Sequence, residues 1–126
     1  METDTRHKVI ASTWMSEGVH TLQLSPMGRF DLSLGYQLWQ VCGLEEGAFH
    51  RYIFDFERLG ELRDSGLAWL LMFSGRAARA GRAVSLANCS HAIAERCLAS
   101  GFVSDEGTGL LLLDAEEISR TQGHRG

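Results

Sequence analysis

The sequence lacks the features that mark several classes of protein. Its three cysteines, Cys42, Cys89 and Cys97, are an odd number without Cys-x-x-Cys spacing, which argues against a disulfide framework and a zinc site. We expect them to be reduced, small hydrophobic residues of the core. No run approaches the roughly 18–20 apolar residues of a membrane-spanning helix, and the N-terminus lacks the charged-then-apolar layout of a signal peptide. The sequence therefore predicts a cytoplasmic protein without a membrane span.

Excess basic charge and catalytic motifs are lacking as well. The formal net charge is −4, whereas nucleic-acid binding needs a basic face that displaces counterions, so a nucleic-acid partner is not expected. The five histidines are dispersed, and the chain contains no Gly-x-Ser-x-Gly elbow. Gly107-Thr108-Gly109 lacks the Lys-Ser/Thr of a nucleotide-binding loop. We therefore predict a protein that is not an enzyme and has no cofactor or metal.

What the chain does contain is an alternation of strand-like and helix-like segments. Its 126 residues suit one domain, with residues 1–7 and 121–126 expected to be flexible. The alternation predicts an α/β layered domain with a mixed four- to five-stranded β-sheet and about four helices. The strands are predicted over residues 9–15, 19–24, 52–56, 83–87 and 110–113, and the helices over residues 34–44, 67–80, 91–100 and 114–120.

The most informative stretch runs from residue 51 to residue 73. An apolar strand over 52–56 leads, through a short polar connection over 57–63, to Asp64-Ser65-Gly66 at the start of the longest helix. The first N–H groups of a helix lack intrahelical partners and the helix dipole favours negative charge there, so a phosphate on Ser65 would be accommodated. The simpler interpretation is that Ser65 or Asp64 only caps this helix.

The same helix carries large side chains beside its predicted core face. Leucine and alanine recur at helical spacing from Leu67 to Ala78, which predicts the buried stripe. Trp69, Met72, Phe73 and Arg76 fall to the side of that stripe, and their composition is typical of a binding hot spot. The alternative is that Trp69 and Phe73 pack beneath a neighbouring helix.

At these residues the sequence resembles the STAS domain of bacterial anti-sigma-factor antagonists. That family has an apolar strand ending in Asp, then a small apolar residue, then Asp-Ser-Ser/Thr-Gly-Leu at a helix start. Asp55 matches the strand Asp, Leu59 and Leu62 match apolar positions, and Ser65-Gly66-Leu67 match the helix start. Arg63 and Asp64 depart from it, because they stand where the family usually has Asp and Ser.

A second family feature lies earlier in the chain. STAS domains carry a strand ending in Gly-x-apolar-Asp before the first helix, and Gly28, Phe30 and Asp31 match it. The resemblance implies that Asp31 lies near Ser65. From the residues alone, Asp31 or Ser33 is expected to cap the following helix, and Asp31 can have both roles.

The resemblance also implies a function. In partner switching, an antagonist with an unmodified serine binds an anti-sigma factor, commonly a serine kinase of the histidine-kinase-like ATPase superfamily, and so frees a sigma factor for transcription. Phosphorylation, here at Ser65, ends that binding, and a PP2C-type phosphatase restores it. The partner-binding residues expected from the resemblance and from the helix face are Asp31, Arg63, Asp64, Gly66, Trp69, Met72, Phe73 and Arg76.

Two other functions are compatible with the sequence. One is a constitutive, non-phosphorylated STAS interaction subunit of a larger assembly, such as a lipid-transport ATPase. The other is a small α/β enzyme or ligand-binding protein in which Asp-Ser-Gly has no signalling role.

Overall fold

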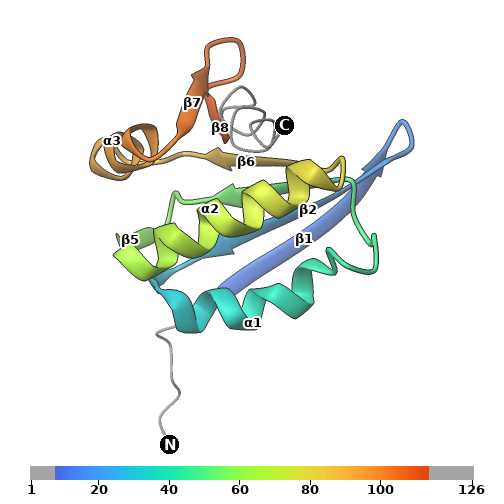
Figure 1. Cartoon of the computed structure of the whole chain (residues 1–126), viewed down its shortest axis with the longest axis horizontal. Coiled ribbons are helices and arrows are strands. Elements are labelled where there is room, and N and C mark those ends of the chain that lie inside the picture. The colour runs from blue at the N-terminus through green and yellow to red at the C-terminus, as the bar shows by residue number, and fades with distance from the viewer. Residues whose placement is uncertain (1–7, 114–126) are drawn as a thin grey trace, which may run out of the picture.

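The computed structural model describes residues 8–113, which form an α/β fold of two layers (Figure 1). The strands are β1 (Val9–Ser16), β2 (Val19–Pro26), β3 (Gly28–Phe30), β4 (Arg51–Asp55), β5 (Leu59–Leu62), β6 (Ala83–Ala87), β7 (Phe102–Asp105) and β8 (Leu110–Leu113). The helices are α1 (Leu32–Cys42), α2 (Asp64–Arg79) and α3 (His91–Ala99). The helix predicted over 114–120 and the flexible ends, 1–7 and 121–126, lie outside the described residues.

The main sheet is mixed and has six strands in the order β1-β2-β4-β6-β8-β7. β2, β4 and β6 are parallel, and β1, β8 and β7 each run antiparallel to the strand beside them. The predicted mixed α/β fold is therefore confirmed, with more strands than the four or five expected. In the strand–helix–strand unit β4-α2-β6, the two strands are parallel neighbours.

A second, small sheet changes the interpretation of residues 57–63. This segment was expected to be only a polar connection, but it contains β5, which pairs in parallel with β3. The two strands are about thirty residues apart in the chain, so local sequence gave little sign of the pairing. Each of them immediately precedes a helix, and their pairing brings the N-termini of α1 and α2 together.

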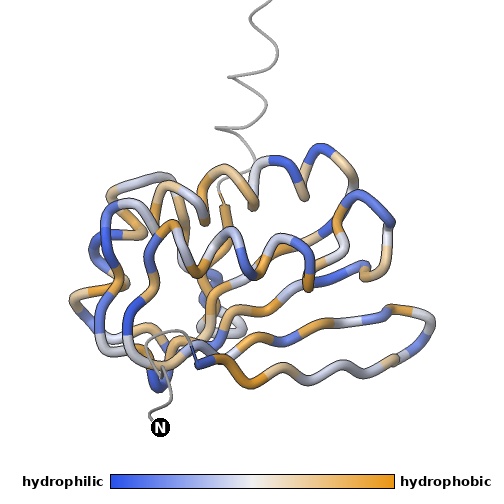
Figure 2. Tube along the Cα trace, turned by 90° about the horizontal axis from the view of Figure 1, so that it is seen from below, coloured by the Kyte–Doolittle hydropathy of each residue, from blue (hydrophilic) through white to orange (hydrophobic). Residues whose placement is uncertain are grey.

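The core lies between the main sheet and helices α1 and α2, which cross one face of that sheet (Figure 1). Figure 2 shows the protein turned by 90°, and in this view too the helices lie on one side of the strands. Alternate residues of neighbouring strands point into this layer and align across the sheet, since Leu22 pairs with Tyr52 and Leu24 with Phe54. Among the described residues, no helix is long and apolar enough to cross a membrane.

Aromatic side chains fill the space beneath α2. Trp69 is 2% exposed and Phe73 is fully buried, and their rings stack at a centroid distance of 5.0 Å. Phe30 and Phe54 pack against the Trp69 ring at 6.0 and 6.2 Å. The predicted position of Trp69 and Phe73 on an outer binding face is therefore wrong. They pack beneath a neighbouring helix, because Gly35 of α1 leaves space for the Trp69 ring.

The cysteines are free, as expected. Cys42 and Cys97 are buried, Cys89 is half-buried, and burial raises the pKa of the Cys42 thiol to about 12. The Tyr52 hydroxyl donates to the carbonyl oxygen of Cys42 at 2.8 Å, which ties the end of α1 to β4.

Replacing Trp69 by alanine should destabilise the fold strongly. A buried Trp to Ala change leaves a cavity and typically lowers the free energy of unfolding by about 3–5 kcal/mol. The matched change Met72→Ala, at a side chain that is 42% exposed on the same helix, should stay within about 0.5 kcal/mol. Urea unfolding followed by circular dichroism measures both. Equal midpoints for Trp69→Ala and the unaltered protein would contradict the buried position.

Glycine at position 35 should be required by packing. A Cβ placed there would lie 2.5 Å from Trp69 Cγ, so Gly35→Ala should lower the free energy of unfolding by about 1–3 kcal/mol. Gly75, inside α2, is the control because the nearest atom to its added Cβ is 3.6 Å away, on the Arg79 side chain. Gly75→Ala should stabilise the protein by up to about 1 kcal/mol through helix propensity. The same sign of change for both variants in urea unfolding would argue against this account.

Candidate functional site

The candidate site is the junction of the small sheet with the start of α2. The Arg63 backbone is extended, with φ −79° and ψ 159°, and its N–H donates to the carbonyl oxygen of Phe30 at 2.9 Å. Any Cβ on Gly66 would collide with that same carbonyl oxygen. A residue without a side chain is therefore needed for the first turn of α2 to approach β3. This explains why Gly66 follows Ser65.

Ser65 lies exposed on this first turn. Its Oγ accepts a hydrogen bond of 3.0 Å from the backbone N–H of Leu32, the first residue of α1. The preceding residue, Asp31, caps α1, since its Oδ1 accepts from the N–H of Leu34 at 3.1 Å. The predicted cap is confirmed at Asp31, and the expected proximity of Asp31 to Ser65 is confirmed by the Leu32–Ser65 bond.

The capping role considered for Ser65 or Asp64 is wrong. The N-cap residue of α2 is Arg63, and its side chain makes no capping hydrogen bond. Ser65 and Asp64 are within the helix, where Ser65 bonds to α1 and Asp64 bonds to α3. The Ser65 hydroxyl therefore joins two helices and does not cap its own.

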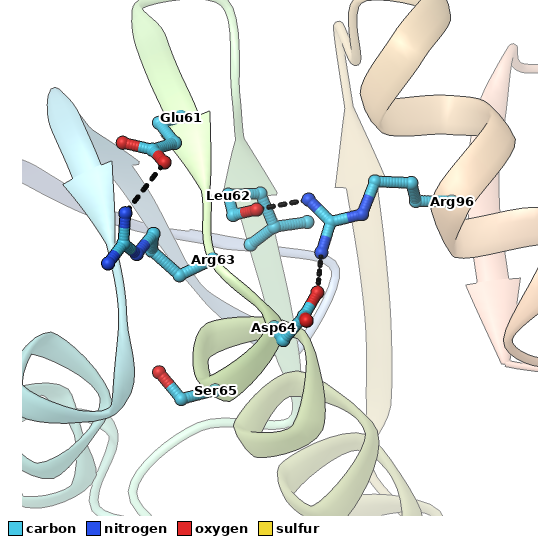
Figure 3. Close-up of a pocket in the computed structure, with 6 residues that line it drawn as sticks. All are labelled: Glu61, Leu62, Arg63, Asp64, Ser65 and Arg96. Carbon is cyan, nitrogen blue, oxygen red and sulfur yellow. Dashed lines mark hydrogen bonds and ion pairs between the residues drawn. The ribbon is translucent and has the colours of Figure 1, made fainter.

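A shallow hollow of about 530 Å³ opens beside Ser65 (Figure 3). Its lining comes from β5, the start of α2, and α3. In the close-up, Arg63 and Ser65 point to one side of the backbone, whereas Asp64 points to the other side, toward Arg96. The lining residues are Glu61, Leu62, Arg63, Asp64, Ser65 and Arg96.

Three ion pairs surround the serine. Arg63 pairs with Glu61 at 3.0 Å, and this hydrogen bond is the main reason that the Arg63 pKa is raised. Arg96 pairs with Asp64 at 2.7 Å, and Arg29 pairs with Asp31 at 3.3 Å. The Arg63–Glu61 pair is exposed, and exposed pairs contribute little to stability, about 0–1 kcal/mol, whereas the Arg29–Asp31 pair is partly buried. Each of the three pairs joins one positive and one negative charge, so together they add no net charge around Ser65.

Sequence reasoning missed Arg96. The Arg96 guanidinium donates both to the carbonyl oxygen of Leu62 and to the Asp64 carboxylate, and so fastens α3 to the junction of β5 and α2. Arg96 follows Asp64 by 32 residues, and no motif links the two positions. The tertiary fold alone brings them together.

The other predicted binding residues of α2 divide into two groups. Met72 and Arg76 are exposed, whereas Trp69 and Phe73 are in the core. The Arg76 guanidinium lies over the Trp39 ring, 5.5 Å from its centroid. Met72 lies about two helical turns from Ser65 on the same helix.

Within residues 8–113, no cluster of His, Cys, Asp or Glu could hold a metal ion.

Comparisons with known proteins identify solved structures that resemble this fold. No family model and no curated protein sequence matches the chain. The unphosphorylated form of the anti-sigma factor antagonist SpoIIAA matches with a TM-score of 0.58 and 20% identity, over 90% of this chain and 99% of SpoIIAA. The phosphorylated form of the Bacillus cell fate determinant SpoIIAA matches with a TM-score of 0.58 and 24% identity, over 90% of this chain and 100% of SpoIIAA.

A third solved structure has the same architecture. It is an uncharacterized protein of the DUF3478 family from Shewanella loihica PV-4, described as having a SpoIIAA-like fold. It matches with a TM-score of 0.55 and 11% identity, over 79% of this chain and 81% of that one. At these identities the comparisons establish the fold: the chain has the SpoIIAA-like fold of STAS-domain anti-sigma factor antagonists, as its sequence predicted.

Proposed function

We propose that this protein is an anti-sigma-factor antagonist-like regulator controlled by phosphorylation of Ser65. With Ser65 unmodified, it binds an anti-sigma factor that is also a serine kinase of the histidine-kinase-like ATPase superfamily. Phosphorylation ends the binding, and a PP2C-type phosphatase reverses it. The protein acts in the cytoplasm as a binding partner, without catalysis or a cofactor of its own.

The observation that carries this proposal is the setting of Ser65. Its side chain is exposed at the first turn of a sixteen-residue helix, beside an open hollow, where a kinase can reach the hydroxyl. The helix dipole and the amide groups of that turn favour a bound anion. The likeness to SpoIIAA, for which both an unphosphorylated and a phosphorylated form have been solved, supports a switch at this position.

The chemistry requires only the kinase's own ATP. A bond forms between Ser65 Oγ and the γ-phosphorus, the bond from that phosphorus to the β-phosphate oxygen breaks, and ADP leaves. The serine proton passes to a base on the kinase. The phosphatase adds water to the phosphoserine and releases inorganic phosphate, which restores the hydroxyl.

The modification would act through local charge. The three ion pairs around Ser65 carry no net charge, because each joins one arginine with one carboxylate. A phosphate would add about −1.5 to −2 charges to this surface. Arg63 could exchange Glu61 for the phosphate, because its present pair is exposed and weak. A partner that fits the balanced surface would then meet new charge and bulk, without any change of fold.

The docking surface that we propose surrounds Ser65 and continues along α2. Asp31, Arg63 and Asp64 form its polar part, and Met72 and Arg76 form its extension along the helix. Gly66 is buried and contributes by letting the first turn of α2 lie against β3. No observation favours the alternative of a constitutive subunit of a lipid-transport ATPase.

Phosphorylation should be specific to Ser65. The purified protein is incubated with ATP and a lysate of its source organism, and the phosphosites are mapped by mass spectrometry. Phosphate is expected on Ser65, and Ser65→Ala should abolish it. Ser33→Ala is the matched control, because Ser33 is also the exposed second residue of a helix. The Ser33→Ala variant should carry as much phosphate on Ser65 as the unaltered protein. Absence of phosphate in all growth phases, or phosphate elsewhere, would overturn the proposal.

Charge at position 65 should weaken binding to the kinase identified in that way. Ser65→Asp should raise the Kd by about tenfold or more, whereas Ser33→Asp should leave the Kd within about twofold. Isothermal titration calorimetry measures both values, and circular dichroism checks that the fold is retained. Equal affinities for the two aspartate variants would show that binding does not respond to charge at Ser65.

A further inference from the structure

The outer edge of β1 is unusual. β1 is the first strand of the six-stranded sheet and pairs only with β2 among the described residues, along its full length of eight residues. Seven of those residues are exposed, including Ile10 at 48%, Trp14 at 38% and Met15 at 62%. The hairpin of β1 and β2 projects from the body of the protein (Figures 1 and 2).

This edge lacks the features that normally prevent strand pairing. Natural edge strands are short, charged, interrupted by proline, or bulged. The other edge strand, β7, is an example, since it has four residues and ends at Asp105. β1 has the sequence VIASTWMS, without charge or proline, and its register with β2 has no bulge. It presents a long, regular row of backbone groups.

The geometry of the hairpin shows which backbone groups of β1 face away from β2. Glu17 and Gly18, with φ of 51° and 81°, form its two-residue turn, so Ser16 and Val19 are the hydrogen-bonded pair that closes it. Hydrogen-bonded and non-bonded pairs alternate along an antiparallel ladder, so the even-numbered residues bond to β2. The bond of 2.9 Å from Met27 N to Lys8 O agrees with this. Among the described residues, the backbone N–H and C=O groups of β1 that face away from β2 are therefore those of Val9, Ala11, Thr13 and Met15.

We propose that β1 pairs antiparallel with β1 of a second copy, about a two-fold axis at Ser12. In this register the outward groups of Val9 and Ala11 bond to those of Met15 and Thr13 in the other copy. Ser12 lies opposite Ser12 in a non-bonded pair. Trp14 lies opposite Ile10, also in a non-bonded pair, where cross-strand side chains are closest.

The side chains make the strand complementary to itself in this register. Every large apolar residue of β1 meets another, because Trp14 faces Ile10 and Met15 faces Val9. A shift of two residues in either direction would place Trp14 opposite Ser12 or Lys8 and lose these pairs.

The charges next to the strand favour the same arrangement. Lys8 precedes β1 and Glu17 follows it, so antiparallel pairing places Lys8 of one copy next to the turn that carries Glu17 of the other. A parallel pair would put like charges together at both ends. The antiparallel dimer joins two six-stranded sheets into one continuous sheet and removes both exposed β1 edges.

The mass in solution tests the dimer. Light scattering after size-exclusion chromatography should give twice the monomer mass at high concentration and the monomer mass on dilution. Ser12→Lys would place two ammonium groups opposite each other, so the dimer dissociation constant should rise about fivefold or more. Ser104→Lys, an exposed serine on the other edge strand, should leave it unchanged. A monomer at every concentration, or equal effects of the two lysines, would overturn the proposal.

Disulfide trapping tests the register. Opposite residues of a non-bonded pair have Cα atoms about 4.5 Å apart, within the range of a disulfide, so Ser12→Cys should give a covalent dimer under oxidised glutathione. Thr13→Cys should cross-link far less, because Thr13 faces Ala11 of the other copy. The unaltered protein controls for its own cysteines, of which Cys42 and Cys97 are buried. Equal cross-linking of the two variants, or none, would exclude this register, independently of any result at Ser65.

Discussion

The contact between the first turn of α2 and the carbonyl group of Phe30 holds the candidate site together. The Arg63 N–H bonds to that carbonyl oxygen, and Gly66 leaves room for it. The Phe30 side chain is fully buried and packs against Phe56 at 5.9 Å. Phe30 therefore anchors the first turn of α2, which carries the exposed Ser65, to the aromatic core. The position of the Ser65 hydroxyl depends on this contact, as does its bond to α1.

The polar part of the site has a different physical character. Each arginine has an acidic partner near the serine, and the Arg63–Glu61 pair is exposed to water, which screens it. An exposed pair of this kind costs little to separate, whereas the packed core beneath it resists rearrangement. The proposed switch would therefore change the charge of this surface while the packed core keeps the fold.

The two edge strands of the main sheet differ in length and in charge. β7 is short and ends in a carboxylate, whereas β1 is long, apolar and open. β1 contributes little to the core, because only Val9 packs against it. The strand's uncharged sequence is thus not explained by the packing of a single copy. The open edge and the serine junction belong to different elements, so the proposed pairing and the proposed switch can be tested separately.

Local sequence patterns determined several secondary-structure elements and part of the candidate site. The apolar run of β4, the Asp-Ser-Gly at the start of α2 and the Asp31 cap are properties of short segments, and so they could be predicted. The match of Gly28, Phe30 and Asp31 to a family pattern was enough to place Asp31 beside Ser65.

The tertiary structure decided what depends on segments far apart in the chain. β5 exists as a strand because β3 lies beside it, and Arg96 reaches Asp64 only because α3 folds back to the junction. Helical spacing could not tell that Trp69 is buried while Met72 is exposed, since the width of a buried helix face is set by its neighbour. Here that neighbour is α1, where Gly35 leaves space for an indole ring.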